Sequence, residues 1–172
     1  AHVYLVMSGS MGFGKVNLLV AELIRKLEAD EYVVVICGNN RRLRQILQTT
    51  FGKNPQVRIL GFTDHVPAYM DASDVIFSKP GGLTSTAVRQ IALVHTSPIP
   101  GCETKNLAFF TSHGMSVTAR TVHGQVTLGR RLMKNEDARI EMQKQQNHCI
   151  PHDSAVEICR LAEKLYAQRN HL

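Results

Sequence analysis

The sequence predicts an α/β protein in which a parallel sheet carries helices on both faces. Short apolar, β-branched runs alternate with segments whose apolar residues recur at helical spacing. Loops rich in Gly, Ser, Thr, Asn and Pro each follow a predicted strand. In a parallel sheet these loops gather at the carboxyl edge, where ligands bind. Without an internal repeat or a linker, residues 1–172 are expected to form one domain.

The elements follow one another along the chain in a regular alternation. The predicted strands are residues 2–7, 32–37, 57–60, 74–77 and 93–96, with a weaker one near 115–117. The first helix follows residue 15 and has its apolar positions at Leu18, Leu19, Leu23, Ile24 and Leu27. The second spans 41–51, with apolar positions at Leu43, Ile46 and Leu47. Further helices are expected at 66–72, from 88–91 onward, at 104–113, in one or two pieces over 122–146, and from 153 or 154 to 168.

Composition narrows the class of function. The chain is 44% hydrophobic and 20% charged, without an apolar run near the roughly 20 residues of a membrane span. The net charge of +6 favours anionic partners, while scattered basic residues and 6% aromatic content argue against nucleic acid. The four cysteines lack metal-ligand spacing and are expected to be free thiols of a reducing cytosol. Because the chain opens directly on a strand, we expect a piece cut at a domain boundary.

The stretch Ser78-Lys79-Pro80-Gly81-Gly82-Leu83-Thr84-Ser85-Thr86 stands between a buried strand and a predicted helix. Two glycines let the backbone approach a ligand closely. Amides and hydroxyls at a helix N-terminus suit a phosphate, because the helix dipole favours an anion there. The alternative for such a stretch is an ordinary tight turn between strand and helix.

A second glycine-rich loop, residues 9–15, fits the spacing GxxxxGK. The next residue is Val16, so the hydroxyl that holds Mg²⁺ in a P-loop is missing, and we exclude an ATPase. Two interpretations remain: a flexible turn, or a loop whose amides bind a diphosphate or a nearby sugar.

Two further loops have candidate binding groups. Residues 61–66 could frame a flat ring, or they could be a plain loop before a helix. Residues 98–101 form a stiff Pro-Ile-Pro-Gly loop that could present Glu103 and Asn106 to hydroxyls, although Glu103 could equally complement a helix dipole. His95 is expected to be buried in its strand. The histidines suggest neither a metal site nor a catalytic base.

Together these motifs resemble the C-terminal domain of GT-B glycosyltransferases. The group in question contains monogalactosyldiacylglycerol synthase and the processive diacylglycerol glucosyltransferases, with the lipid II N-acetylglucosaminyltransferase more distant. The matching strings, in family order, are GSMGFGK (9–15), CGNN (37–40), LGFTDHVPAYMDASD (60–74), SKPGGLTST (78–86) and PIPGCETKN (98–106).

The resemblance implies a Rossmann-like domain, the C-terminal half of a GT-B fold, that binds a UDP-sugar without a cofactor or metal. The positions implied for the nucleotide are Gly9, Ser10, Gly12, Gly38, Asn39, Phe62, Thr63, Val66, Ser78, Gly81, Gly82, Leu83 and Thr84. Those implied for the sugar are Pro100, Gly101, Glu103 and Asn106. The family implies hexose transfer to a lipid such as diacylglycerol, at the cytoplasmic face of an anionic membrane.

The sequence departs from the family in two ways. A glutamate that usually grips the ribose is missing after Thr86, where the segment is about two residues short. The N-terminal domain, which supplies the acceptor site and the catalytic base, is also missing, so this chain alone is expected to bind donor without turnover. The alternatives are a UDP-sugar epimerase, for which Glu103 is the one strong acid candidate, and a non-catalytic nucleotide-sugar-binding module.

Overall fold

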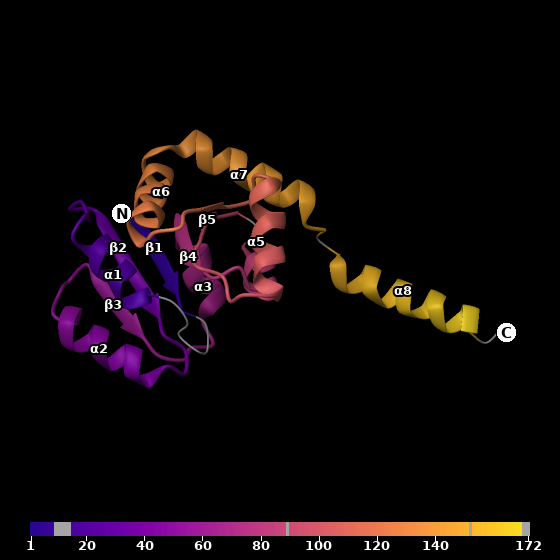
Figure 1. Ribbon diagram of the computed structural model, residues 1–172, viewed down its shortest axis with the longest axis horizontal. Coiled ribbons are helices and arrows are strands. Elements are labelled where there is room, and N and C mark those ends of the chain that lie inside the picture. Colours follow the sequence, from indigo (N-terminus) through magenta and orange to yellow (C-terminus); the bar gives the residue numbers. More distant parts are fainter. Residues whose placement is uncertain (9–14, 89, 152, 170–172) are drawn as a thin grey trace.

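The computed structural model describes residues 1–8, 15–88, 90–151 and 153–169. These residues form a six-stranded sheet in the order β3-β2-β1-β4-β5-β6, in which neighbouring strands are parallel. Figure 1 shows helices on both sides of this sheet, which confirms the predicted Rossmann-like α/β class. The strands are β1 (His2–Met7), β2 (Glu31–Ile36), β3 (Val57–Leu60), β4 (Val75–Ser78), β5 (Ala92–His95) and β6 (Val117–Thr118).

The helices fall between and after the strands. They are α1 (Val16–Ile24), α2 (Arg41–Phe51), α3 (Val66–Asp71), α4 (Gly82–Ala87), α5 (Cys102–Ser112), α6 (Val122–Lys134), α7 (Glu136–Cys149) and α8 (Ser154–Arg169). α1 packs against both α2 and α6. α8 extends away from the rest of the molecule (Figure 1). In the part of the chain described here, no helix combines the length and the apolar character needed to cross a membrane.

β1 lies at the centre of the sheet and fixes where the loops meet. It pairs with β2 on one side and with β4 on the other, so the strand order reverses between β1 and β4. Such a reversal opens a crevice at the carboxyl ends of the strands. Tyr4, Leu5 and Phe77 are fully buried here, and the ring of Phe77 packs against Gly129 of α6.

The amino edge of the sheet is held by a buried ionic cluster. Glu31, at the start of β2, is only 2% exposed. Its carboxylate accepts hydrogen bonds from Arg130 Nη1 at 2.8 Å and from the Tyr4 hydroxyl at 3.1 Å. Arg130 Nη2 also donates to Glu28 at 2.9 Å. The cluster therefore ties α6 to the edge opposite the predicted ligand loops.

The fourth helix differs from its prediction. The sequence placed a helix start at 88–91, whereas α4 is Gly82–Ala87 and the chain has left the helix at Val88. Val88 and Ile91 are buried, so they anchor the entry into β5 instead of beginning a helical face. The glycine and hydroxyl residues of the motif thus form the helix itself.

Two of the apolar positions that mark the predicted helices face solvent. Leu18 is 51% exposed and Ile46 is 44% exposed, because the buried stripe of α1 runs through Val16, Leu19, Val20 and Leu23 and that of α2 through Leu43 and Leu47. Leu27 lies beyond the end of α1, although it still packs against the core. The first five strands, by contrast, are confirmed to within one residue at each end, whereas β6 begins two residues later than the strand expected near 115–117.

Candidate functional site

One small apolar pocket gathers five of the predicted nucleotide-binding residues. It has a volume of about 220 Å³ and lies at the carboxyl ends of β1 and β2. Its lining is Met7, Ile36, Gly38, Asn39, Phe62, Thr63 and Val66. The ring of Phe62 is 70% exposed and stands at the rim, where a flat ligand could stack on it.

Local backbone chemistry shapes this pocket. Gly38 has a φ of +56°, a conformation that side-chain-bearing residues rarely adopt, and it lets the chain turn sharply after β2. Asn40 then caps α2, its Oδ1 accepting from the Leu43 N–H at 2.9 Å. The turn and the cap together place Gly38 and Asn39 opposite the residues that follow β3.

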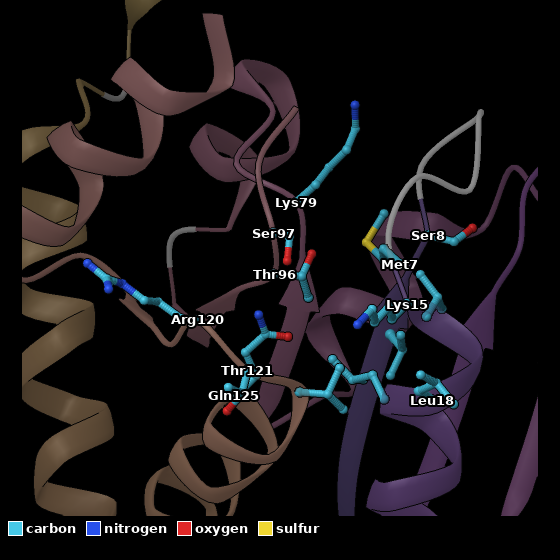
Figure 2. A pocket seen from close by; sticks show the side chains of 14 residues that line it. Met7, Ser8, Lys15, Leu18, Lys79, Thr96, Ser97, Arg120, Thr121 and Gln125 are labelled. Carbon is cyan, nitrogen blue, oxygen red and sulfur yellow. The ribbon is translucent and has the colours of Figure 1, made fainter. Parts of the chain in front are cut away.

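A larger cavity of about 460 Å³ adjoins the first, since Met7 lines both. Figure 2 shows it between the ends of the central strands, the start of α1 and the start of α6. Its polar lining consists of Ser8, Lys15, Lys79, Thr96, Ser97, Arg120, Thr121 and Gln125. Three cationic residues and several hydroxyls make this cavity suitable for an anion.

The glycine-rich motif after β4 lies beside these cavities, and of its residues Lys79 lines the larger one. Ser78 ends β4 and is buried, Gly81 is extended, and Gly82 begins α4. Lys79 is the residue of this motif that reaches the larger cavity. The predicted roles of Ser78, Gly81, Gly82, Leu83 and Thr84 in diphosphate binding stay predictions. Gly9, Ser10 and Gly12 lie outside the described residues.

The predicted sugar-binding residues are engaged within the protein. Gly101, with a φ of +102°, turns the chain into α5 and places Glu103 in the first helical turn, where it is 5% exposed. Glu103 Oε1 accepts from Lys79 Nζ at 2.6 Å, and Oε2 accepts from the Ile99 N–H at 2.7 Å. Asn106 Nδ2 donates to the Pro80 carbonyl at 3.0 Å. The start of α5 is therefore tied to the glycine-rich motif through Lys79 and Pro80, and to the preceding loop through Ile99. The roles of Pro100, Gly101, Glu103 and Asn106 toward a sugar stay predictions.

Glu103 is ionised in this arrangement. Burial by itself would raise the pKa of the carboxyl, but the hydrogen bonds from Lys79 and from the Ile99 amide, with the Lys79 charge, hold the pKa below its usual value. A buried carboxylate thus stands beside the cationic cavity with both oxygens occupied.

Behind the glycine-rich motif lies a buried polar cluster. His95 is fully buried, as the sequence predicted; its Nε2 lies 3.0 Å from Ser85 Oγ and its Nδ1 lies 2.9 Å from Ser116 Oγ. Phe110 packs edge-on against the imidazole. The cluster links α4, β5 and the segment before β6. Burial lowers the pKa of His95 to about 4, so the ring is neutral at pH 7.

Acid should weaken the fold through this histidine. The unfolded chain binds a proton near pH 6.5 and the folded chain only near pH 4, so between these values the unfolded state binds more protons and stability falls as pH falls. Going from pH 7 to pH 5 should cost about 2 kcal/mol from this side chain. Urea unfolding at both pH values measures the loss, which His95→Gln should lack and the exposed-site control His65→Gln should keep. An equal loss in all three proteins would contradict the assignment.

Sequence analysis overlooked several groups that the fold brings to the larger cavity. Two of them, Thr96 and Ser97, follow β5. The others are Arg120 and Thr121, between β6 and α6, and Gln125 in the first turn of α6; no motif singled out any of the five. Lys79 could have been found from the sequence, because a lysine between a predicted strand and two glycines of a ligand loop indicates a cation at the site. Among the described residues, no group of three or more His, Cys, Asp or Glu side chains is placed to hold a metal ion.

Comparison with known proteins agrees with this geometry. The family description "Glycosyltransferase family 28 C-terminal domain" matches residues 3–93. A processive diacylglycerol beta-glucosyltransferase of Staphylococcus carnosus is 29% identical over 91% of the chain and 40% of its own length. One from Staphylococcus epidermidis is 32% identical over 77% of the chain and 34% of its length. The chain thus spans well under half of these relatives.

Solved structures share the fold. MurG of Acinetobacter baumannii superposes with a TM-score of 0.79 at 21% identity, covering 95% of this chain and 49% of its own. The UDP-GlcNAc 2-epimerase of Neisseria meningitidis, solved bound to UDP-GlcNAc, gives 0.71 at 15% identity, covering 97% and 45%. These likenesses show that this chain shares its fold with part of each solved protein.

Proposed function

The chain belongs to the glycosyltransferase family 28 C-terminal domains, and on that premise we propose that it is the donor-binding domain of a hexosyltransferase. The donor is a UDP-sugar and the acceptor is a lipid such as diacylglycerol. The name of the Staphylococcus relatives supports the choice of acceptor.

The pocket lined by Gly38, Asn39, Phe62, Thr63 and Val66 carries this proposal. A shallow apolar pocket with an exposed aromatic ring at its rim suits the flat face of a uracil. Five residues that the family motif assigns to the nucleotide come from two separate loops, and the fold brings them together.

The adjoining cavity would receive the diphosphate and sugar. Lys15 and Lys79 line it, and the glycine-rich motif opens beside it. Negative charge grows on the diphosphate as the bond to the sugar breaks, so fixed cations and amides lower the barrier by being in place beforehand. The leaving group is thus stabilised by the protein's own donors.

The acceptor belongs to the part of the transferase beyond this chain. We propose that the whole protein works at the cytoplasmic face of an anionic membrane, with the net charge of +6 adding a weak electrostatic attraction. The isolated chain should bind donor without transferring hexose.

Calorimetric titration tests the donor assignment. UDP, UDP-glucose, UDP-galactose, UDP-N-acetylglucosamine and ADP are titrated without metal and then with Mg²⁺. Binding of the uridine ligands but not ADP supports the proposal, and the sugar ranking identifies the donor. Failure of every uridine ligand to bind would sink it in favour of a module with another ligand. With the full-length protein, transfer needs an acceptor lipid, whereas an epimerase acts on the UDP-sugar alone.

Replacing Phe62 by alanine should weaken UDP binding about tenfold, because the base loses its stacking partner. Tyr32→Ala is the matched control, since Tyr32 is also an exposed aromatic residue but lies at the amino end of β2. Calorimetry with UDP compares the two variants. Equal affinity in the Phe62→Ala variant and the parent chain would place the base elsewhere.

A further inference from the structure

Lys79 and Glu103 form an ion pair between the loop after β4 and the first turn of α5, two segments that the proposed function assigns to different parts of the donor. Lys79 lies in the glycine-rich motif after β4, and Glu103 lies 24 residues further on in α5. Their side chains are 29% and 7% exposed. Figure 2 shows Lys79 extending from the cavity wall beside Thr96 and Ser97.

This pair is part of a set of contacts that engages Glu103 within the protein. Both carboxylate oxygens accept hydrogen bonds, one from Lys79 and one from the Ile99 amide. The carboxylate is also recessed below the surface. A sugar hydroxyl that approaches Glu103 must therefore compete with the Lys79 ammonium for the same oxygen.

Resting on the donor-binding function proposed above, we propose that Lys79 binds the diphosphate and that its ion pair with Glu103 is an exchangeable latch. Diphosphate binding draws the ammonium away from Glu103 Oε1. The freed oxygen then accepts a hydroxyl of the hexose. Lys79 in this way couples recognition of the diphosphate to recognition of the sugar.

The direction of the coupling follows from charge compensation. A diphosphate has more negative charge than a carboxylate, so it competes well for the ammonium. Removing the ammonium from a recessed carboxylate leaves that carboxylate short of a donor, which is costly. UDP alone incurs this cost in full, whereas a UDP-hexose offsets it with its own hydroxyl. The latch thus favours the intact donor over the product nucleotide.

The test compares three ligands, uridine, UDP and UDP-glucose, by calorimetry on the full chain and its variants. Lys79→Met should bind UDP at least tenfold more weakly while keeping its uridine affinity within twofold, since uridine has no phosphate. Lys79→Arg should retain most of the UDP affinity. Lys53→Met, an exposed lysine in the turn after α2, controls for loss of one positive charge.

The variant Glu103→Gln distinguishes the latch from an ion pair that only stabilises the fold. Without the competing carboxylate, Lys79 is released to the diphosphate, so UDP should bind several-fold more tightly. The additional affinity that glucose gives to UDP-glucose over UDP should disappear at the same time. The two changes have opposite signs, which general destabilisation of the fold cannot produce.

Each outcome decides the matter. Loss of uridine and UDP affinity by the same factor in Lys79→Met, or weaker UDP binding in Glu103→Gln, would overturn the latch and leave the donor-binding function standing. If the parent chain binds uridine and UDP while Lys79→Met binds both unchanged, Lys79 has no part in the site. If the parent chain binds none of the three ligands, the proposed function itself fails, and the latch with it.

Discussion

Replacing Arg130 by methionine is expected to lower the free energy of unfolding by about 3 kcal/mol. The guanidinium of Arg130 donates to Glu31, whose side chain is 3% exposed. Methionine keeps much of the packing of the aliphatic stem but leaves a buried carboxylate without its cation. The expected loss of unfolding free energy is at the lower end of the range for a buried ion pair that loses one partner. The reason is that the Tyr4 hydroxyl and the Glu28 amide still donate hydrogen bonds to Glu31.

Urea unfolding of matched variants isolates the ion pair. Arg131→Met changes the adjacent, exposed arginine of the same helix and should alter stability by less than about 0.5 kcal/mol. The double variant Glu31→Gln with Arg130→Met removes both charges and should recover part of the loss, since no buried ion remains uncompensated. Equal losses in the single and double variants would show that packing, and not charge, accounts for the effect.

Replacing Gly129 by alanine is expected to cost about 2 to 3 kcal/mol, although alanine is the better helix former. A Cβ on Gly129 would lie 2.3 Å from Cζ of Phe77, closer than any real contact. Phe77 is fully buried in the second central strand, so its ring has little room to withdraw. The strain should exceed the gain in helix propensity of up to about 1 kcal/mol.

A double-mutant cycle with Phe77→Leu tests this contact directly. Phe77→Leu alone should destabilise the protein because it leaves a cavity, whereas in the Gly129→Ala background it should cost little, since the new methyl group fills part of that space. Unfolding free energies from denaturant titration give the coupling. Additive losses would mean that the two residues do not compete for the same volume.

The strands were predictable because each is a short apolar run followed by a loop rich in Gly, Ser, Thr, Asn or Pro. Residues 57–60 illustrate this: the strand is confirmed to the residue, and a loop that begins with Gly61 follows it. α4 was not predictable in the same way, because a run of glycine, threonine and serine has low helix propensity. Its helical form depends on tertiary packing, with Ser85 hydrogen-bonded to the buried His95. The exposure of Leu18 and Ile46 likewise depends on which side of each helix meets a neighbour.

The sequence predicted which loops form the candidate site, but it did not predict which side chains in the site contact one another. Asn39 and Phe62 both follow strands, and the strand rule alone gathers them at one edge. The ion pair of Lys79 with Glu103 and the bond of Asn106 to Pro80 connect residues more than 20 positions apart, between groups with no shared pattern. Only the relative placement of β4 and α5 reveals that the acid expected to meet a sugar already has a partner.

The central place of β1 also bears on how the chain folds. Val6 of β1 pairs with Val35 of β2, but on its other side it pairs with Phe77 of β4, some 71 residues away. The first three strands can therefore assemble early, with one long edge of β1 unpaired until β4 arrives. Parallel pairings at such separation close large loops before they gain contacts, so folding should take milliseconds to seconds rather than microseconds. In that interval β1 is an open strand edge, and self-association of the refolding chain should increase with its concentration.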